Sequence, residues 1–86
     1  MTKIILVKTK TCVYCPTASA IWKDLHQHYK FDYEEVDATT PKGQELVMKF
    51  MIMAVPTTII EKDGKQSVAF VGLPRKEKAA ELVKGG

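Results

Sequence analysis

Short apolar runs alternate with helical periodicity along the chain, and this order restricts the possible folds more than any other feature. The run "KIILVK" (3–8) is typical of a strand that is buried on both faces. Beyond it, apolar residues recur at spacings of three and four, which predicts a helix over about 13–29. These residues are Ala18, Ile21, Trp22, Leu25 and Tyr29. The chain therefore begins with a strand and then a helix.

The second half of this pattern starts with another strand. The segment "FDYEEVDA" (31–38) predicts that strand, and Thr40 followed by Pro41 predicts the cap and first turn of a second helix. The apolar stripe of that helix consists of Leu46, Val47 and Phe50.

Two further strands and a helix complete the chain. The runs "TTII" (57–60) and "SVAFVG" (67–72) are rich in β-formers, and the Asp63-Gly64 pair between them predicts a tight hairpin turn. Pro74 is expected to start a last helix, whose inward side chains are Ala79, Leu82 and Val83.

The predicted order is β-α-β-α-β-β-α, which indicates an α/β fold. Strands joined through helices are usually parallel neighbours, so we expect the first three strands to be parallel and the hairpin to add an antiparallel edge. The result is a mixed four-stranded sheet flanked by three helices. With 86 residues, the chain suits a single domain over 1–86.

Composition excludes several classes of function. The chain is 45% hydrophobic and 27% charged with a formal charge of +3, and its lysines are scattered rather than clustered. This pattern argues against nucleic-acid binding. The four aliphatic residues near the N-terminus are too few for a signal peptide or a membrane span. We therefore expect a cytoplasmic, monomeric protein with no membrane partner.

Two cysteines in the segment "KTKTCVYCPT" (8–17) form the main candidate site. In a reducing cytosol such a pair is more often catalytic or metal-binding than a structural staple. A redox dithiol, half of a metal site and a simple structural turn are the three alternatives. His26 and His28 lie about 200° apart around a helix and cannot close on one ion, so no metal site is predicted. A cluster shared by two protomers remains a further alternative.

The position of Cys12 favours the redox dithiol. Cys12 falls between the first strand and the first helix, where unpaired backbone N–H groups and the helix dipole stabilise a thiolate. Lys8 and Lys10 add positive charge. Cysteines in such settings have pKa values lowered from about 8.5 to roughly 3.5–7.5, so Cys12 is the predicted nucleophile. Cys15 lies nearly one helical turn deeper and is the predicted resolving thiol.

At this point the chain resembles the thioredoxin/glutaredoxin superfamily over its whole length. The resemblance rests on the segment in which "CVYC" joins a strand to a helix, and on the order of the elements. It rests also on two later segments, "AVPTTII" and "EKDGKQSVAFVG". It implies a thioredoxin-like fold in which Pro56 is cis and lies against the cysteines. The backbone of Val55 would then pair with an extended substrate segment. The predicted substrate-binding residues are Val13, Tyr14, Val55, Pro56 and Lys10.

The two branches of that superfamily differ at positions that matter here. The chain length and Tyr14 resemble glutaredoxins, whereas the hairpin segment resembles thioredoxins. Thioredoxins carry a buried aspartate six residues before the first cysteine, where this chain has Leu6. Glutaredoxins carry an acidic residue for the glutathione amine after the hairpin, where this chain has "VGLP" (71–74). We therefore predict a thiol–disulfide oxidoreductase of glutaredoxin size and thioredoxin-like activity.

Expected partners follow from this interpretation. They are disulfide-containing proteins as substrates and a thioredoxin-reductase-type enzyme as electron donor, with glutathione as the alternative donor. The Cys12–Cys15 disulfide itself serves as the redox centre, and no metal or organic cofactor is expected. A glutathione-dependent glutaredoxin is the first alternative, and a non-catalytic binding module is the second. Met48, Met51 and Met53 are predicted to be mainly packing residues, with Met53 alternatively on a docking surface.

Overall fold

The computed structural model describes residues 2–84. The limits predicted for the domain, residues 1 and 86, fall outside this range. The elements are β1 (Lys3–Lys8), α1 (Cys15–His28), β2 (Asp32–Asp37), α2 (Pro41–Phe50), β3 (Thr57–Lys62), β4 (Lys65–Val71) and α3 (Lys76–Lys84). They confirm the predicted order and the mixed four-stranded sheet with three helices.

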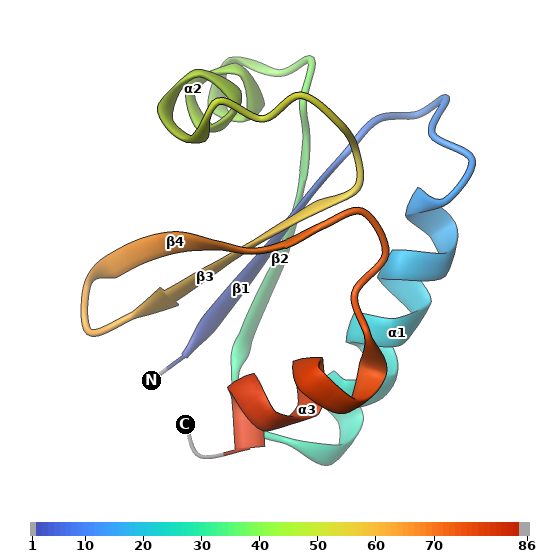
Figure 1. The fold of residues 1–86 in the computed structure, drawn as a ribbon, viewed down its shortest axis with the longest axis vertical. Coiled ribbons are helices and arrows are strands. Elements are labelled where there is room, and N and C mark those ends of the chain that lie inside the picture. The colour runs from blue at the N-terminus through green and yellow to red at the C-terminus, as the bar shows by residue number, and fades with distance from the viewer. Residues whose placement is uncertain (1, 85–86) are drawn as a thin grey trace.

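The sheet has the strand order β2-β1-β3-β4, with α2 on one face and α1 and α3 on the other (Figure 1). β1 and β2 are parallel, whereas β3 is antiparallel to both β1 and β4. The prediction that the first three strands are all parallel was therefore wrong. β3 starts beside the C-terminal end of β1, where Val7 pairs with Thr57. This happens because α2 and the loop 51–56 bring the chain back to the end of the sheet at which β2 finishes.

Side-chain alternation divides the core into two layers. On the α1 and α3 face the buried residues are Ile4, Leu6, Ala18, Trp22, Leu25, Phe31, Ala79 and Val83. On the α2 face they are Ile5, Val7, Val36, Leu46 and Ile59. β1 contributes to both layers because it is central, which explains its unbroken apolar run.

Trp22 anchors the first layer, as its helical spacing predicted. Its side chain is fully buried, and the indole Nε1 donates a hydrogen bond to Thr58 Oγ1 at 3.0 Å. This bond satisfies the one polar atom of the ring and joins α1 to β3. α1 is thereby fixed against the sheet, together with the cysteines at its start.

The start of α2 packs directly against the end of β2. Thr40 caps the helix by accepting a hydrogen bond from the Gly43 N–H, and Pro41 occupies the first turn, both as predicted. A Cβ atom at Gly43 would lie 1.9 Å from the carbonyl oxygen of Asp37. Only glycine allows this approach of the two backbones.

The hairpin and the last helix complete the second half of the fold. Asp63 and Gly64 have φ values of 53° and 78°, which match the tight turn predicted there. The last helix begins at Lys76 rather than at Pro74, since the Arg75 carbonyl accepts its first backbone bond, from the Ala79 N–H. Within residues 2–84, no helix is long and apolar enough to cross a membrane.

Candidate active site

Cys12 and Cys15 form a disulfide just beyond the end of β1. Their Cα atoms are 5.4 Å apart. Cys12 is partly exposed, whereas Cys15 is buried with 3% exposure. The helical spacing predicted that Cys15 lies deeper than Cys12.

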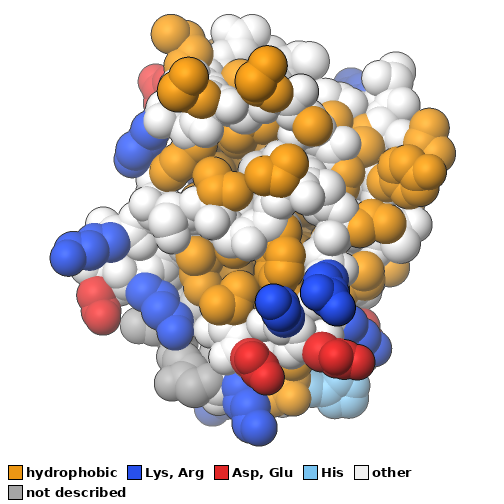
Figure 2. All heavy atoms as spheres, in the orientation of Figure 1, with side chains coloured by type: hydrophobic (Ala, Val, Ile, Leu, Met, Phe, Trp, Pro, Cys, Tyr) orange, Lys and Arg blue, Asp and Glu red, His pale blue; other side chains and the backbone are white. Residues whose placement is uncertain are grey.

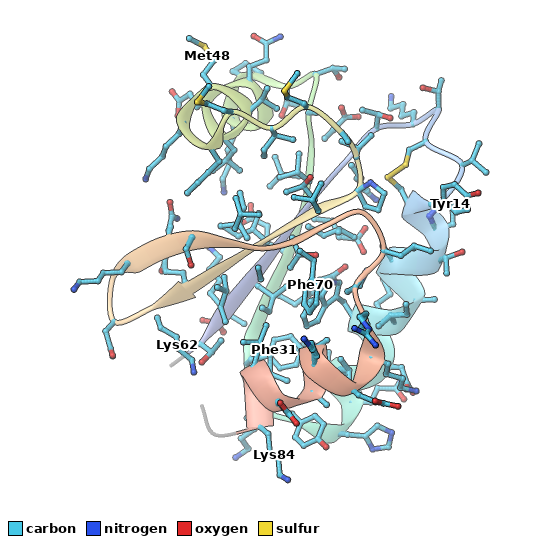
Figure 3. The ribbon with its side chains drawn as sticks, in the orientation of Figure 1. Tyr14, Phe31, Met48, Lys62, Phe70 and Lys84 are labelled. Atoms are coloured by element: carbon cyan, nitrogen blue, oxygen red, sulfur yellow. A yellow bond between two sulfur atoms is a disulfide. The ribbon has the colours of Figure 1, made fainter. Side chains whose placement is uncertain are left out.

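The two residues between the cysteines form a turn that precedes the helix. α1 begins at Cys15 rather than near residue 13 as predicted, so Cys12 lies before the helix. Val13 and Tyr14 are 82% and 61% exposed, and no side chain caps the helix. Figure 3 shows Tyr14 on the outside of this turn, beside the disulfide. The two side chains border Cys12 without covering it.

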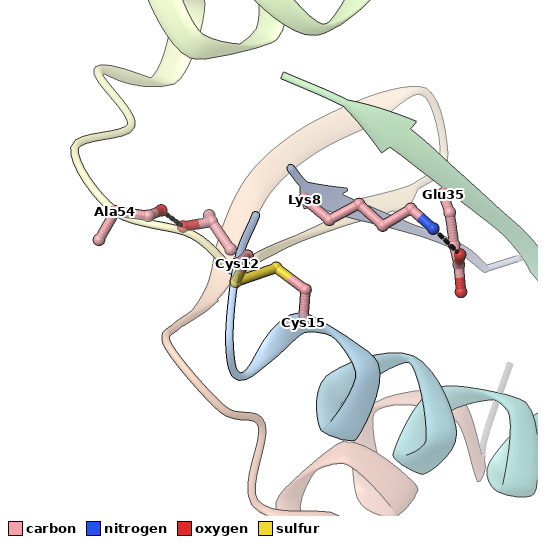
Figure 4. The surroundings of a disulfide bond; sticks show 6 residues. Lys8, Cys12, Cys15, Glu35 and Ala54 are labelled. Carbon is pink, nitrogen blue, oxygen red and sulfur yellow. Dashed lines mark hydrogen bonds and ion pairs between the residues drawn. A yellow bond between two sulfur atoms is a disulfide. The ribbon is translucent and has the colours of Figure 1, made fainter. Parts of the chain in front are cut away.

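The loop before β3 forms the wall opposite Cys12. The Val55–Pro56 peptide bond is cis, and Pro56 is buried. The carbonyl oxygen of Ala54, in the same loop, accepts a hydrogen bond from Thr57 Oγ1 at 2.7 Å (Figure 4). Among the described residues, neither the N–H nor the C=O of Val55 has a hydrogen-bond partner. The loop therefore offers a free donor and a free acceptor next to the disulfide.

A cavity of about 460 Å³ opens on the other side of the disulfide, between β1, β2 and α1. Both cysteines line it. Its charged side chains are Lys8, Lys10, Lys23, Glu35 and Asp37. Lys10, predicted to bind substrate, is exposed at the rim.

Glu35 is the most tightly held charge in this cavity. Its carboxylate accepts hydrogen bonds from Lys8 Nζ at 2.5 Å, from Tyr33 OH at 2.7 Å and from Ser19 Oγ. Burial by itself raises the pKa of Glu35, but these three donors together lower it to about 2. Burial and the Glu35 charge raise the pKa of Tyr33. Glu35 is therefore a carboxylate at any pH near neutrality.

Sequence reasoning did not find this group. Lys8 was expected to support the Cys12 thiolate, but its ammonium is paired with Glu35. The available signal was the pair Glu34-Glu35 in a predicted strand, because neighbouring side chains point to opposite faces. One of the two had to lie on the α1 face, and the strand register shows that it is Glu35.

Two of the three methionines of the segment 48–53, Met51 and Met53, line a second, apolar depression. Met48, Met51 and Met53 are 79%, 81% and 97% exposed, so the prediction that they are mainly packing residues was wrong. A groove of about 260 Å³ lies between the end of α2 and β4, and Met51, Met53 and Val71 line it. Ala54 and Thr57 also line it, which makes it continuous with the wall beside Cys12. Figure 2 shows apolar side chains over this part of the surface and charged ones over the hairpin tip and α3.

Metal-binding side chains do not gather in the part of the chain that the structure describes. Residues 2–84 hold no group of three or more His, Cys, Asp or Glu side chains that could bind a metal ion. His26 and His28 are both exposed, and His28 Nε2 lies 3.8 Å from Asp24 Oδ1.

Two cysteines that form a disulfide, one partly exposed and the other buried, can take part in thiol–disulfide exchange, in which a thiolate attacks a disulfide; this is the chemistry of the thiol–disulfide oxidoreductases. Comparison with known proteins agrees. Residues 2–84 match the family model of the thioredoxin domain. A thioredoxin from Methanocaldococcus jannaschii is 30% identical over 82 residues, covering 95% of this chain and 92% of that protein. The chain belongs to the thioredoxin family and has a thioredoxin-type redox function.

Solved structures share the fold. Thioredoxin-2 of the malaria parasite aligns with a TM-score of 0.85 at 19% identity, covering 100% of this chain and 84% of that one. A thioredoxin-like protein from Clostridium perfringens aligns with a TM-score of 0.81 at 26% identity, covering 99% and 70%. The thioredoxin-like fold predicted from the sequence is thus confirmed.

Proposed function

We propose that this protein reduces disulfide bonds in other proteins, with Cys12 as nucleophile and Cys15 as resolving thiol. The observation that carries the proposal is the difference in exposure between the two cysteine residues, of which Cys12 is partly exposed and Cys15 buried. The Cys12 thiolate attacks one substrate sulfur, forms a mixed disulfide and releases the other sulfur as a thiolate. Cys15 then gives its proton to the solvent and attacks Cys12, which restores the Cys12–Cys15 disulfide and releases the second substrate sulfur as a thiolate. Two electrons pass from the dithiol to the substrate.

Two features favour a protein substrate over a small disulfide. The N–H and C=O of Val55, which have no partner within residues 2–84, can form main-chain hydrogen bonds with an extended segment that presents its disulfide to Cys12. The apolar groove beyond Ala54 can receive a side chain of the same segment. Val13 and Tyr14 border the other side of the attack site.

The proposed electron donor is an enzyme of the thioredoxin-reductase type. Such a donor docks on an apolar surface and needs no pocket for a charged tripeptide. Glutathione is the second candidate, because Lys10 and Lys23 line the cavity beside the disulfide and could bind its carboxylates. Gly72–Pro74 supplies no acidic side chain for the glutathione amine.

Mixed-disulfide trapping tests the chemistry. Cys15→Ser should accumulate mixed disulfides with substrate proteins, since it attacks but cannot resolve, and Cys12→Ser should accumulate almost none. Trapping by Cys12→Ser alone would reverse the two roles. Trapping by neither variant would favour a non-catalytic binding module.

Insulin reduction tests the donor. NADPH is supplied either with a thioredoxin reductase or with glutathione and glutathione reductase. Faster turnover with the thioredoxin reductase supports the proposal. Saturable turnover in the glutathione system alone would make the protein a functional glutaredoxin.

A further inference from the structure

The cavity beside the dithiol contains charges from every element that surrounds it. β1 contributes Lys8, the loop after it Lys10, and α1 Lys23. β2 contributes Glu35 and Asp37, with the Tyr33 hydroxyl bonded to Glu35. The loop 51–56 on the other side of Cys12 has no ionisable side chain. The electrostatic environment of the cysteines is therefore set mainly from β1, β2 and α1.

Within this group, Lys8 and Glu35 are the fixed pair. The Lys8 side chain runs from near the disulfide toward Glu35, and Figure 4 draws the ion pair between them. Donors from three elements hold the carboxylate: Lys8 from β1, Ser19 from α1 and Tyr33 from β2. The side chains of Lys8 and Glu35 are 37% and 17% exposed, so water screens this pair less than an ordinary surface pair.

The charge state of Glu35 limits what it can do. A carboxyl group with a pKa of about 2 stays ionised and takes up no proton from a thiol near neutral pH. Its remaining effect on the dithiol is that of a fixed negative charge with a bound ammonium. A carboxylate disfavours a nearby thiolate, whereas an ammonium favours it.

We propose that Glu35 is a positioning residue that holds the Lys8 ammonium away from the cysteines and thereby keeps the dithiol strongly reducing. Reduction breaks the Cys12–Cys15 bond and adds two electrons from the donor and one proton from the solvent, which leaves a thiolate at Cys12 and a protonated Cys15. An unpaired ammonium beside them would stabilise this reduced state and make the protein a poorer reductant, since a stabilised reduced form raises the potential. The inference rests on the proposed function and concerns how its driving force is set.

The test compares Glu35→Gln with a neighbouring glutamate. Glu34 is also ion-paired, with Lys3 and Lys42, but it lies on the α2 face of the sheet, away from the cavity. Glu34→Gln is therefore the matched control. Lys8→Met removes the ammonium, Lys8→Arg keeps a cation, and the double variant Lys8→Met/Glu35→Gln removes both charges. Far-ultraviolet circular dichroism of each oxidised variant checks the fold.

Two readouts separate an electrostatic role from a structural one. The first is the pH midpoint of thiolate formation at Cys12, from the ultraviolet absorbance of the reduced protein. The second is the equilibrium with a dithiothreitol redox buffer. Glu35→Gln should lower the midpoint and shift the equilibrium toward the reduced protein by about threefold to tenfold, a rise of about 14 to 30 mV. Lys8→Met should move the midpoint in the opposite direction.

The remaining variants decide the interpretation. Lys8→Arg and the double variant should both lie close to wild type in both readouts. A Glu35→Gln variant that behaves like Glu34→Gln overturns the proposal, and so does one whose midpoint rises. If Glu35→Gln does not fold, a Lys8→Met midpoint equal to that of wild type overturns it instead. If the wild-type protein cannot reduce insulin at all, the proposed function is contradicted. The pH midpoints and redox equilibria of the variants can still be measured in that case, so the two failures can be told apart.

Discussion

Glu35 is the register partner of Leu6 across the parallel β1–β2 pair, so its carboxylate lies on the same face of the sheet as α1 and the cysteines. Thioredoxins carry a buried aspartate at the position of Leu6 on β1, where this chain has an apolar side chain. The structure supplies a carboxylate to the same region from the neighbouring strand. Four predictions test the site and the fold around it.

The ion pair of Glu35 should make stability depend on pH. The pKa of Glu35 falls from an ordinary value of about 4.3 to about 2 on folding, so its stabilisation is present above pH 5 and is lost as the pH falls toward 2. After allowance for solvent screening, Glu35→Gln should lower the unfolding free energy by about 1–2 kcal/mol at pH 7. Urea unfolding of the oxidised protein at pH 7, 5 and 3 measures this difference, which should shrink toward pH 3. Glu45→Gln, at an exposed position, serves as control. If the difference in unfolding free energy between wild type and Glu35→Gln stays constant from pH 7 to pH 3, the lowered pKa of Glu35 is contradicted.

The two cysteines of the reduced protein should differ in reactivity. Cys12 is partly exposed beside the uncapped start of α1, whereas Cys15 is buried. Iodoacetamide should therefore modify Cys12 much faster, with a pH midpoint below the value of about 8.5 for a free thiol. Mass spectrometry of the alkylated protein over a pH series measures both sites. Equal rates at Cys12 and Cys15 would contradict the assigned roles.

Met53 should contribute to docking of protein substrates. A cation at this 97% exposed position would lie at the apolar groove and disfavour burial of an apolar segment. Met53→Lys should lower kcat/KM for insulin by about threefold or more while leaving the reduction of a small aromatic disulfide unchanged. Met48→Lys is the matched control, because Met48 is exposed on α2 and does not line the groove. An equal loss in both variants would indicate a general charge effect.

Gly43 should tolerate no side chain. A Cβ atom there meets backbone atoms of β2, and neither α2 nor β2 can move without repacking the second layer of the core. Gly43→Ala should lower the unfolding free energy by about 3 kcal/mol. Chemical unfolding measures the loss, and Glu45→Ala on an exposed side of the same helix should change stability by less than about 0.5 kcal/mol. If Gly43→Ala is as stable as wild type, the close approach of α2 to the end of β2 is contradicted.

The sequence by itself determined the elements and the depth of the cysteines. Apolar spacing identified α1 and β1, Thr40 identified the start of α2, and Asp63-Gly64 identified the hairpin turn, because each depends on residues close together in the chain. Helical geometry alone placed Cys15 deeper than Cys12. Val55 and Pro56 were predicted as site residues only through the resemblance to known redox proteins, since nothing local connects them to Cys12.

Tertiary structure decided the features that depend on which elements become neighbours. β3 runs antiparallel to β1 because α2 and the loop 51–56 bring the chain back to the end of the sheet at which β1 and β2 finish. Met51 and Met53, which follow α2, are exposed because none of the elements between residues 2 and 84 covers that end of the helix. Lys8 and Glu35 are 27 residues apart in the chain, and only the alignment of β1 with β2 brings their charges within 2.5 Å. Periodicity indicates which face of an element is buried, but not which side chain of another element it meets there.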